Sequence, residues 1–326
     1  MISLEIIKSN LLSPVVLSFY LGVFAKLLKS DLKFPDSFFS GLSAYLLLAI
    51  GLKGGVALTT IPFHMLISPI LATITISLCI PSAAFLICKY IAHLKKEDAA
   101  AMAAHYGSVS IVTFIATKVF LENAGLKIDE YMTGLVALLE LPGIIFALLL
   151  AQNLFERKAP SSVSFFDKFT GIFLSKSIYL LWGGLLIGIL TGPEGFKKVA
   201  PFFVDPFYGM LVFFMLEMGL VAGEHIEDLK KIKGFLAMFA VGMPILSGSF
   251  AIFLAKIAGF SLANATIFAA MAASSSYIAA PAAVRITLPS ANPSYYLTSS
   301  LVITFPFNLS LGIPLYYMLT KWWYQV

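Results

Sequence analysis

The sequence predicts an all-α membrane protein that crosses the bilayer many times. Of its 326 residues, 59% are apolar and only 12% are charged, and the mean hydropathy is +0.92. A soluble fold of this length could not keep so much apolar surface away from water. The apolar residues also form runs of about 18 residues or more, as a helix needs to cross the hydrocarbon core, whereas barrel strands alternate polar and apolar residues. The composition therefore excludes a soluble enzyme, a disordered chain and a disulfide scaffold, and the length of the apolar runs favours helices over a β-barrel.

Ten hydrophobic segments are predicted to be membrane spans. They are residues 11–28, 38–57, 65–91, 99–120, 130–155, 171–190, 204–222, 234–258, 262–284 and 294–322. At about 1.5 Å of rise per residue, each can cross about 30 Å of hydrocarbon. The connections are short, and the longest polar one, residues 156–168, contains Pro160.

The two halves of the chain resemble each other in three places that follow in the same order. Residues 102–108 match 271–277, residues 51–55 match 219–223, and residues 141–143 match 305–307. In each match the second stretch follows the first by about half the chain length, which indicates a duplication. Residues 1–155 are predicted to be the first five-helix repeat, 156–170 a cytoplasmic linker, and 171–326 the second repeat.

The odd number of spans in each repeat predicts an inverted topology. After five spans the chain enters the second repeat from the opposite side of the membrane, as in many secondary transporters. Lys and Arg are more frequent in one alternate set of loops, including residues 26–33, 89–96 and 230–233. The positive-inside rule makes these loops cytoplasmic and places both termini outside.

Spans four and nine are predicted to be interrupted helices that form the ligand site. Both are rich in small residues and carry hydroxyl groups near their middle. A break in a membrane helix exposes peptide groups that protein or ligand must satisfy, and half-helix N-termini attract anions. The predicted anion-binding residues are Gly107, Ser108, Ser110, Ser274, Ser275 and Ser276. The alternative is that these hydroxyl groups bond to carbonyl groups of their own helices and that the small residues allow close packing.

The predicted coupling-ion ligands are Ser110, Thr113 and Glu140, because hydroxyl and carboxylate oxygens suit Na⁺. Glu140 lies in the middle of span five, directly before Leu141 and Pro142. A carboxylate at the bilayer centre costs about 2.5 kcal/mol or more on insertion scales, so it faces protein or a watery cavity. Two roles are open for Glu140. It binds a cation or carries a proton, or it is a protonated or paired carboxyl that stabilises the kink at Pro142.

Four other polar residues within or beside spans have less definite roles. Glu217 resembles Glu140 but has no carboxyl at the repeat-equivalent place. His105 is expected to make a structural hydrogen bond, and Lys53 is expected to extend its ammonium group toward the membrane surface. Arg285 either attracts an anion or anchors a cytoplasmic loop.

Motifs of other functional classes are absent from the sequence. It contains no His-Glu-x-x-His pair, no Gly-x-Ser-x-Gly elbow and no Walker-type loop. We therefore expect no enzyme, no ATP-driven pump and no cofactor, with no metal beyond a coupling Na⁺. The net charge of +5 lies in short loops, as membrane topology requires, so nucleic acid is not an expected partner. Transport driven by an ion gradient remains.

Four stretches resemble the sodium-dependent bicarbonate transporter family known from cyanobacteria. They are Ala-Ala-Ser-Ser-Ser through Pro-Ser-Ala-Asn-Pro-Ser at 272–294, Ile-Gly-Leu-Lys-Gly-Gly at 50–55, Tyr-Gly-Ser-Val-Ser at 106–110 with Thr113, and Leu-Glu-Leu-Pro at 139–142. The resemblance implies a ten-span fold of two intertwined inverted repeats with separate core and gate parts. It also implies Na⁺-coupled bicarbonate uptake by an elevator-like movement. The family's ligand region corresponds here to Ser108, Ser110, Thr113, Ser274, Ser275 and Ser276.

The resemblance further implies a homotrimer in contact with membrane lipid, in the bacterial inner membrane, with a PII-like cytoplasmic regulator as a partner. The chain departs from the family at Tyr277, where cyanobacterial members have an aspartate, and in its short central loop. Three hypotheses follow. The first is a Na⁺-coupled symporter of a small inorganic anion, with bicarbonate the leading candidate. The second is a proton-coupled carrier of another small anion or carboxylate. The third is a membrane receptor or scaffold that transports nothing.

Overall fold

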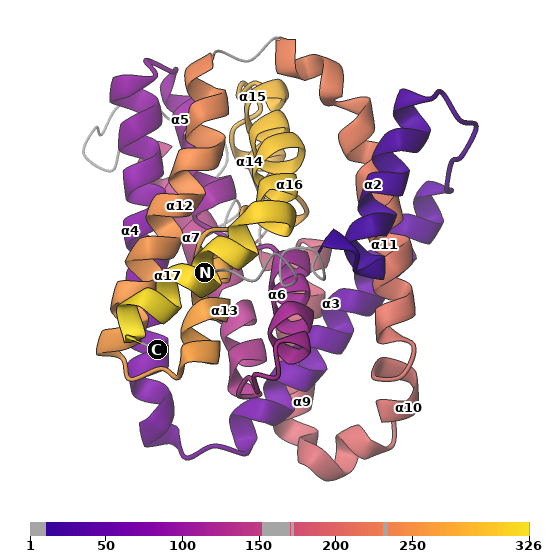
Figure 1. Ribbon diagram of the computed structural model, residues 1–326, viewed down its shortest axis with the longest axis vertical. Helices are drawn as coiled ribbons and strands as arrows, with labels where there is room; N and C mark the ends of the chain where they lie inside the picture. The colour runs from indigo at the N-terminus through magenta and orange to yellow at the C-terminus, as the bar shows by residue number, and fades with distance from the viewer. Residues whose placement is uncertain (1–10, 152–169, 171–172, 231–233, 326) are drawn as a thin grey trace.

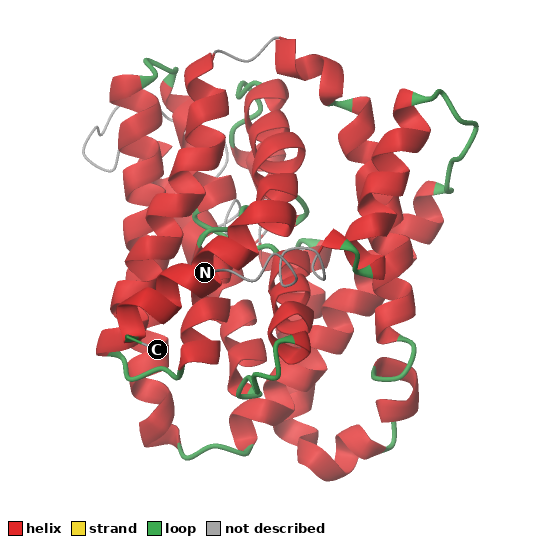
Figure 2. Ribbon diagram, in the orientation of Figure 1, coloured by secondary structure: helices red, strands yellow, loops and turns green. Residues whose placement is uncertain are grey.

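A computed structural model of the chain describes residues 11–151, 170, 173–230 and 234–325. Within these ranges the regular structure is entirely helical (Figure 2). Eight helical stretches are long and apolar enough to cross a membrane, and two shorter apolar helices, Pro14–Leu27 and Leu262–Ala272, accompany them. The predicted all-α class is confirmed. Most of the predicted linker, residues 156–169, lies outside the described residues.

The first half of the chain contains six helices. They are α2 (Pro14–Leu27), α3 (Asp36–Thr59), α4 (Phe63–Leu86, extended by the π-helical turn η1, Ile87–Ile91), α5 (Lys96–Tyr106), α6 (Ile111–Asn123) and α7 (Tyr131–Ala151). Helix α2 begins as the sequence directs, since the Ser13 hydroxyl accepts a hydrogen bond of 3.3 Å from Val16 N and Pro14 follows the cap.

The second half follows a similar order. Its elements are α9 (Lys176–Lys197), α10 (Ala200–Phe203), α11 (Phe207–Glu224), η2 (Ile226–Lys230), α12 (Gly234–Ile257), α13 (Leu262–Ala272), α14 (Ala279–Thr287), α15 (Pro293–Leu297), η3 (Thr298–Thr304), α16 (Phe305–Phe307), η4 (Asn308–Gly312) and α17 (Ile313–Tyr324). Helix α9 bends at Gly192, whose φ of +59° is accessible to glycine, and Pro193 follows it. The wide π-helical turns η3 and η4 flank Pro306, which lacks an N–H to donate.

The helices form two groups, which lie side by side in Figure 1. We call α2, α3, α9, α10 and α11 the lateral group, and the other described helices the central group. Within the lateral group, α3 packs along α9 and α2 packs along α11. Helix α3 also contacts α7 of the central group.

Glycines allow the two helix pairs of the lateral group to touch through their backbones. A Cβ atom on Gly51 of α3 would lie 3.0 Å from Gly184 Cα of α9 and would overlap the Leu181 carbonyl oxygen. A Cβ atom on Gly219 of α11 would likewise overlap the Phe19 carbonyl oxygen of α2 and lie 3.0 Å from Gly22 Cα. Small residues permit such close helix pairs where the surrounding lipid gives no hydrophobic driving force. Gly51 and Gly219 are also one of the pairs matched between the halves of the sequence.

Two helix pairs in the central group are joined by short non-helical segments that meet halfway through the molecule. Residues 107–110 connect α5 to α6, and residues 273–278 connect α13 to α14. Helix α5 packs beside α14, and α6 packs beside α13. The stretch from α5 to α6 and the stretch from α13 to α14 therefore run in opposite directions (Figure 1). These segments lie in predicted spans four and nine.

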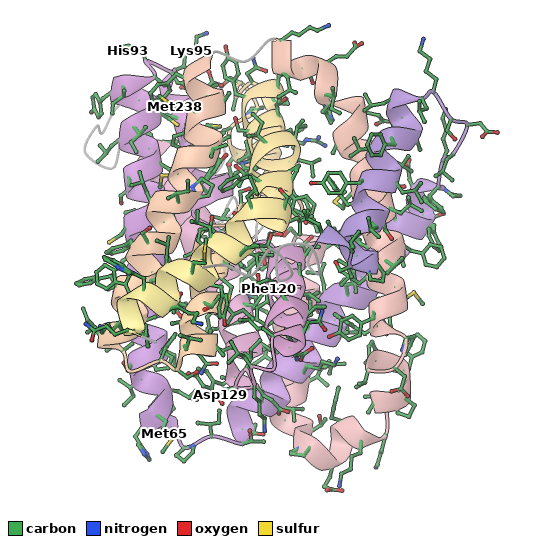
Figure 3. All side chains as sticks on the ribbon, viewed as in Figure 1. Met65, His93, Lys95, Phe120, Asp129 and Met238 are labelled. Carbon is green, nitrogen blue, oxygen red and sulfur yellow. The ribbon has the colours of Figure 1, made fainter. Side chains whose placement is uncertain are left out.

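Basic loops gather at one end of the helices. The loop after α2 and the loop before α5 lie at the same end, where Figure 3 labels His93 and Lys95. Met65 and Asp129 lie at the opposite end. This common placement is the pattern that the predicted topology requires, since all loops on one side of a membrane must lie at one end of the bundle.

Candidate functional site

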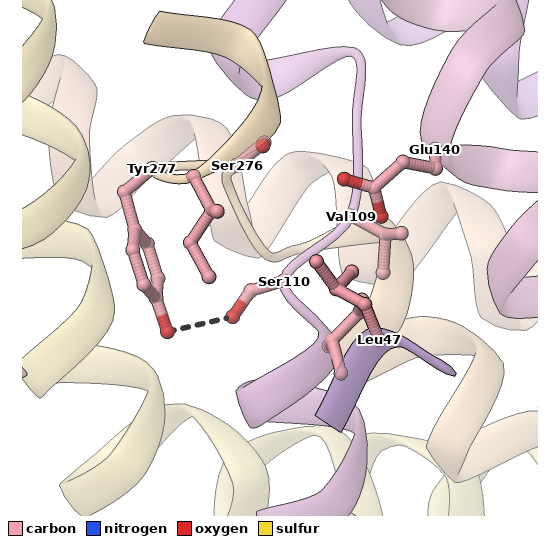
Figure 4. Close-up of a pocket in the computed structure, with 8 residues that line it drawn as sticks. Leu47, Val109, Ser110, Glu140, Ser276 and Tyr277 are labelled. Atoms are coloured by element: carbon pink, nitrogen blue, oxygen red, sulfur yellow. Dashed lines mark hydrogen bonds between the residues drawn. The ribbon is translucent and has the colours of Figure 1, made fainter. Parts of the chain in front are cut away.

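A small cavity lies where the two non-helical segments meet (Figure 4). Its volume is about 10 Å³, which is roughly the room that one water molecule needs. Val109, Ser110 and Ile111 line it from the first segment, and Ser276, Tyr277 and Ile278 line it from the second. Glu140 of α7 and Leu47 of α3 complete the lining. The space is therefore suited to a small ion, with one carboxylate and three hydroxyl groups among its walls.

Close packing fixes the first segment in place. A Cβ atom on Gly143 of α7 would overlap the Gly107 carbonyl oxygen, and a Cβ atom on Gly107 would lie 2.6 Å from Pro81 Cβ of α4. Gly107 N donates to the Ala103 carbonyl oxygen at 2.8 Å, which ends α5. The Ser110 hydroxyl then accepts a hydrogen bond of 3.2 Å from Thr113 N and begins α6. Gly143 thus lets the segment lie directly against α7, and Gly107 lets it lie against α4.

Hydrogen bonds to the end of α5, to the first segment and to η4 hold the second segment. Ser276 N donates to the His105 carbonyl oxygen at 2.8 Å, and Ser110 N donates to the Ser274 hydroxyl at 2.7 Å. The Ser276 hydroxyl accepts a bond of 3.2 Å from Ala280 N in the first turn of α14. Asn308 of η4 donates to the Ala273 carbonyl oxygen at 2.9 Å. Peptide groups that a continuous helix would satisfy internally are therefore satisfied by the opposite segment and the C-terminal helix.

Glu140 places its carboxylate at the cavity. Its side chain is 3% exposed, and Oε2 has no hydrogen-bond partner within the described part of the chain. In Figure 4 the carboxylate points from α7 toward Val109 and Ser110. A buried charge without a partner is costly, so a carboxylate in this position requires a cation or a proton.

Tyr277 forms another wall of the cavity. The Ser110 hydroxyl donates to the Tyr277 oxygen at 3.3 Å, which joins the two segments through side chains (Figure 4). The Tyr277 ring packs against Phe305 with 4.9 Å between ring centroids. Tyr277 was not among the predicted site residues. Its position directly after three serines was the available signal, but the sequence presented it only as a departure from the family pattern.

Comparison with protein families decides the class of the chain. A model of the Na⁺-dependent bicarbonate transporter superfamily matches residues 14–321. The chain belongs to this superfamily. A comparison with curated proteins found no match. Membership confirms the resemblance seen in the sequence and, together with the apolar helices, makes the chain an integral membrane protein. It also agrees with the expectation of a transporter rather than an enzyme.

In this superfamily member, three of the predicted site residues line the cavity: Ser110, Ser276 and Glu140. The other five predicted residues are buried nearby in different roles. Ser108 donates to the Glu140 carbonyl oxygen at 3.0 Å, and Ser274 donates to the Met271 carbonyl oxygen at 2.7 Å. The Ser275 hydroxyl points toward the Ser300 carbonyl oxygen at 3.4 Å.

Gly107 and Thr113 are the remaining two predicted residues. Gly107 packs against α4 and α7, as described above. Thr113 is buried on α6, and its hydroxyl oxygen has no hydrogen-bond partner within the described residues. It lies one helical turn beyond Ser110 and does not line the cavity. The predicted residues all lie in or beside the two non-helical segments or on α7, but the sequence did not distinguish residues that face the cavity from residues that hold the segments.

The other polar residues of the spans lie away from the cavity, and one of them lines a second space. His105 bonds to the Ala101 carbonyl oxygen at 2.7 Å and stacks on Tyr296, which fits a structural role. Arg285 is exposed on α14. Glu217, on α11, has a buried Oε2 without a hydrogen-bond partner in the described chain. The Lys53 ammonium lies 4.6 Å from the centroid of the Phe207 ring.

The second space is a larger cavity, of about 380 Å³, toward the end of the molecule where α6 finishes. Lys53 of α3, Lys118 of α6, and Glu130 and Thr133 at the start of α7 are among its lining residues. Helices α3, α6 and α7 thus contribute to both cavities. Among the described residues no group of three or more His, Cys, Asp or Glu is placed so that it could hold a metal ion.

Proposed function

We propose that the chain is a Na⁺-coupled symporter of a small inorganic anion, with bicarbonate as its substrate. The observation that carries this proposal is the small cavity between two non-helical segments, with Glu140, Ser110 and Ser276 on its walls. Secondary transporters place substrate and coupling ions at such breaks, because unwound backbone is tolerated in a membrane only where protein or ligand satisfies it. Membership in the Na⁺-dependent bicarbonate transporter superfamily supports the choice of ions.

Glu140 is the proposed centre of the Na⁺ site. Its unpartnered Oε2 offers a negatively charged oxygen at the cavity. Ser110 contributes a hydroxyl oxygen, and Thr113, one turn further along α6, has a buried hydroxyl oxygen that is also without a partner in the described chain. A Na⁺ ion bound by these oxygens would neutralise the buried carboxylate and remove the cost of its burial.

The anion is proposed to bind at the serine hydroxyl groups near the starts of α6 and α14. Ser110 begins α6, and Ser276 bonds to the first turn of α14. Helix N-termini carry partial positive charge, so an anion between them is stabilised without a fixed cationic side chain. Ser110 then belongs to both sites, which places cation and anion close together. Their mutual attraction is strong in a low-dielectric interior and makes binding of one favour binding of the other.

We further propose ten spans arranged as two inverted repeats of five. The non-helical segments 107–110 and 273–278 would be the breaks of spans four and nine. Two features support this arrangement: α3 packs on α9 as α2 packs on α11, and α5 packs beside α14 as α6 packs beside α13. Each pairing takes one helix from each half of the chain, as an axis of pseudo-symmetry in the membrane plane requires.

An elevator-like movement is the proposed mechanism. The central group provides every lining residue of the small cavity except Leu47, which belongs to α3 of the lateral group. The central group would carry the bound ions along the lateral group, with the larger cavity beside Lys53 and Lys118 as a path to one side. At the contact between the groups, a Cβ atom on Gly54 of α3 would lie 3.1 Å from Gly134 Cα of α7, so few side chains oppose sliding there.

Reconstituted protein tests the proposal. Liposomes containing the purified protein should take up labelled bicarbonate when an inward Na⁺ gradient is imposed, and much less with K⁺ in its place. Ser110→Ala and Ser276→Ala should each lower this uptake at least tenfold at equal protein content. Ser82→Ala is the matched control, because Ser82 is half-buried on α4, does not line the cavity and donates to the Leu78 carbonyl oxygen of its own helix. Wild-type uptake in both serine variants would overturn the site.

A proton-coupled carrier of another small anion or carboxylate is the second candidate. It is favoured by the same unpartnered carboxyl of Glu140, since a proton can replace Na⁺ as the neutralising cation. Uptake that follows an imposed pH gradient and ignores Na⁺ would select this candidate. A panel of labelled anions in the same liposomes would then identify the substrate.

The assembly and setting of the transporter are also proposals. We propose a homotrimer in a bacterial inner membrane, in contact with lipid, with both termini outside and a PII-like regulator on the cytoplasmic side. Exposed apolar side chains along α2 and α9, such as Leu21 and Leu190, fit contact with lipid or with another subunit. Native mass spectrometry of the purified protein, with and without a PII-like protein, tests the stoichiometry and the partner.

A further inference from the structure

We infer that Tyr277 sets the upper size limit of the transported anion, because its ring forms the wall of the small cavity on the side where it reaches Ser110. The inference rests on the proposed function, in that it takes this cavity as the anion site. It concerns a residue of this chain that was not predicted to be in the site.

Tyr277 forms one wall of the small cavity. It is 9% exposed and directly follows Ser276 in the second segment, and both residues line the cavity. Its hydroxyl reaches across to the first segment, where Ser110 donates to it at 3.3 Å. The side chain therefore closes the space between the two segments (Figure 4).

Aromatic packing prevents the ring from turning away. Phe305 contacts Tyr277 with 4.9 Å between centroids at 61°. Phe305 contacts Phe19 of α2 in the same way, at 5.1 Å and 83°. Both Phe19 and Phe305 are 1% exposed. A Tyr277 ring that moved out of the cavity would have to displace Phe305 and then a residue of the lateral group, and close-packed interiors resist such displacement.

Ring and hydroxyl have separable roles. The ring occupies volume that a larger anion would need. The hydroxyl, which can donate and accept, fixes the direction of the Ser110 hydroxyl. Tyr277→Phe keeps the ring and removes the bond, whereas Tyr277→Ala removes both. The size limit should follow the ring alone.

Competition in liposomes is the first test. Wild-type Na⁺-dependent uptake of labelled bicarbonate is measured against formate, acetate, propionate and lactate, which increase in size. We expect inhibition by formate and little by propionate or lactate. In Tyr277→Ala the concentration of propionate or lactate needed for half inhibition should fall at least tenfold, whereas Tyr277→Phe should keep the wild-type limit. Tyr106→Phe is the control for loss of a buried tyrosine hydroxyl elsewhere, since Tyr106 bonds to Thr304 at 2.7 Å. An unchanged order of competitors in Tyr277→Ala would overturn the inference.

Access of thiol reagents is the second test, and it does not require transport. The native cysteines Cys79 and Cys88 are replaced by alanine, and Val109→Cys places a thiol in the cavity wall. A small and a bulky methanethiosulfonate are compared at equal concentration. The ratio of bulky to small labelling rates should rise at least tenfold when Tyr277→Ala is added and should not change with Tyr277→Phe. An unchanged ratio would overturn the inference.

The two tests separate the inference from the function on which it rests. If wild-type protein transports no bicarbonate, the proposed substrate fails, and the thiol ratio still decides whether Tyr277 limits the cavity. If bicarbonate is transported and the thiol ratio rises but the competitor order stays the same, the cavity widens without governing selection, and the inference is wrong while the function stands.

Discussion

The two non-helical segments that meet at the small cavity are built differently. Residues 107–110 are short and are fixed by direct backbone contact with α7 at Gly143. Residues 273–278 are longer and are fixed by hydrogen bonds, from Ser276 N to the His105 carbonyl and from Ser110 N to the Ser274 hydroxyl. The first segment therefore depends on packing, and the second depends on the first. Each segment places a serine at the cavity, Ser110 and Ser276, and the second segment also supplies the aromatic wall, Tyr277.

The largest effect is expected when the packing of the first segment is disturbed. Gly143→Ala would drive a Cβ atom into the Gly107 carbonyl oxygen. Both partners in this contact are backbone, so no flexible side chain can move aside. Overpacking of this kind costs about 3 kcal/mol, and we expect loss of Na⁺-dependent uptake together with a lower unfolding temperature in detergent. Gly242→Ala on α12 is the control, because its Cβ atom would meet nothing within 4 Å. Equal behaviour of the two variants would contradict direct backbone contact.

A large effect confined to the coupling ion is expected for Glu140→Gln, which keeps the shape of the side chain and removes its charge. The Na⁺ concentration for half-maximal uptake should rise at least tenfold, equivalent to about 1.4 kcal/mol, with little change in unfolding temperature. Glu122→Gln is the control, since Glu122 is half-exposed on α6 and pairs with Lys118 at 3.9 Å. An unaltered Na⁺ dependence would remove Glu140 from the ion site.

A smaller effect is expected where the second segment is bonded to the first. Ser274→Ala leaves Ser110 N, a buried donor, without its 2.7 Å acceptor. An unsatisfied buried donor costs about 1 to 3 kcal/mol, so the unfolding temperature should fall measurably, while the relative inhibition by different anions should not change. If stability stays at the wild-type value, the bond does not hold the segments together.

The smallest effect is expected for Ser275→Ala. The Ser275 hydroxyl lies 3.4 Å from the Ser300 carbonyl oxygen and does not line the cavity. A weak bond of this length contributes about 0.5 kcal/mol or less, so both stability and uptake should remain close to those of the wild type. A strong loss of anion affinity in Ser275→Ala would show instead that Ser275 faces the anion during transport, as the family resemblance implies.

Much of the fold followed from simple patterns. Each predicted hydrophobic segment overlaps an apolar helix, because a membrane helix requires a continuous apolar run and charged residues are confined to its ends. Clusters of Ser and Gly in spans four and nine marked the places where the helices stop. Pro142 was a poorer guide, since α7 continues through it from Tyr131 to Ala151.

The cavity itself could not be predicted to the same degree. In a helix, spacing tells which side chains share a face, but residues 107–110 and 273–278 have no such period. Contacts with other helices decide that Ser110 and Ser276 face the cavity whereas Ser108 and Ser274 face backbone carbonyl groups. Tyr277 required the structure for the same reason, since its role depends on Phe305, which is distant in sequence.

Phe305 touches Tyr277 on one side and Phe19 on the other, and Phe19 belongs to the group of helices past which the site is proposed to slide. During such sliding the Phe19 contact must be broken, and the support behind the tyrosine would then be lost. The width of the anion site would in that case vary over the transport cycle. Discrimination between anions would then belong to the stage of the cycle in which Phe305 contacts both Tyr277 and Phe19.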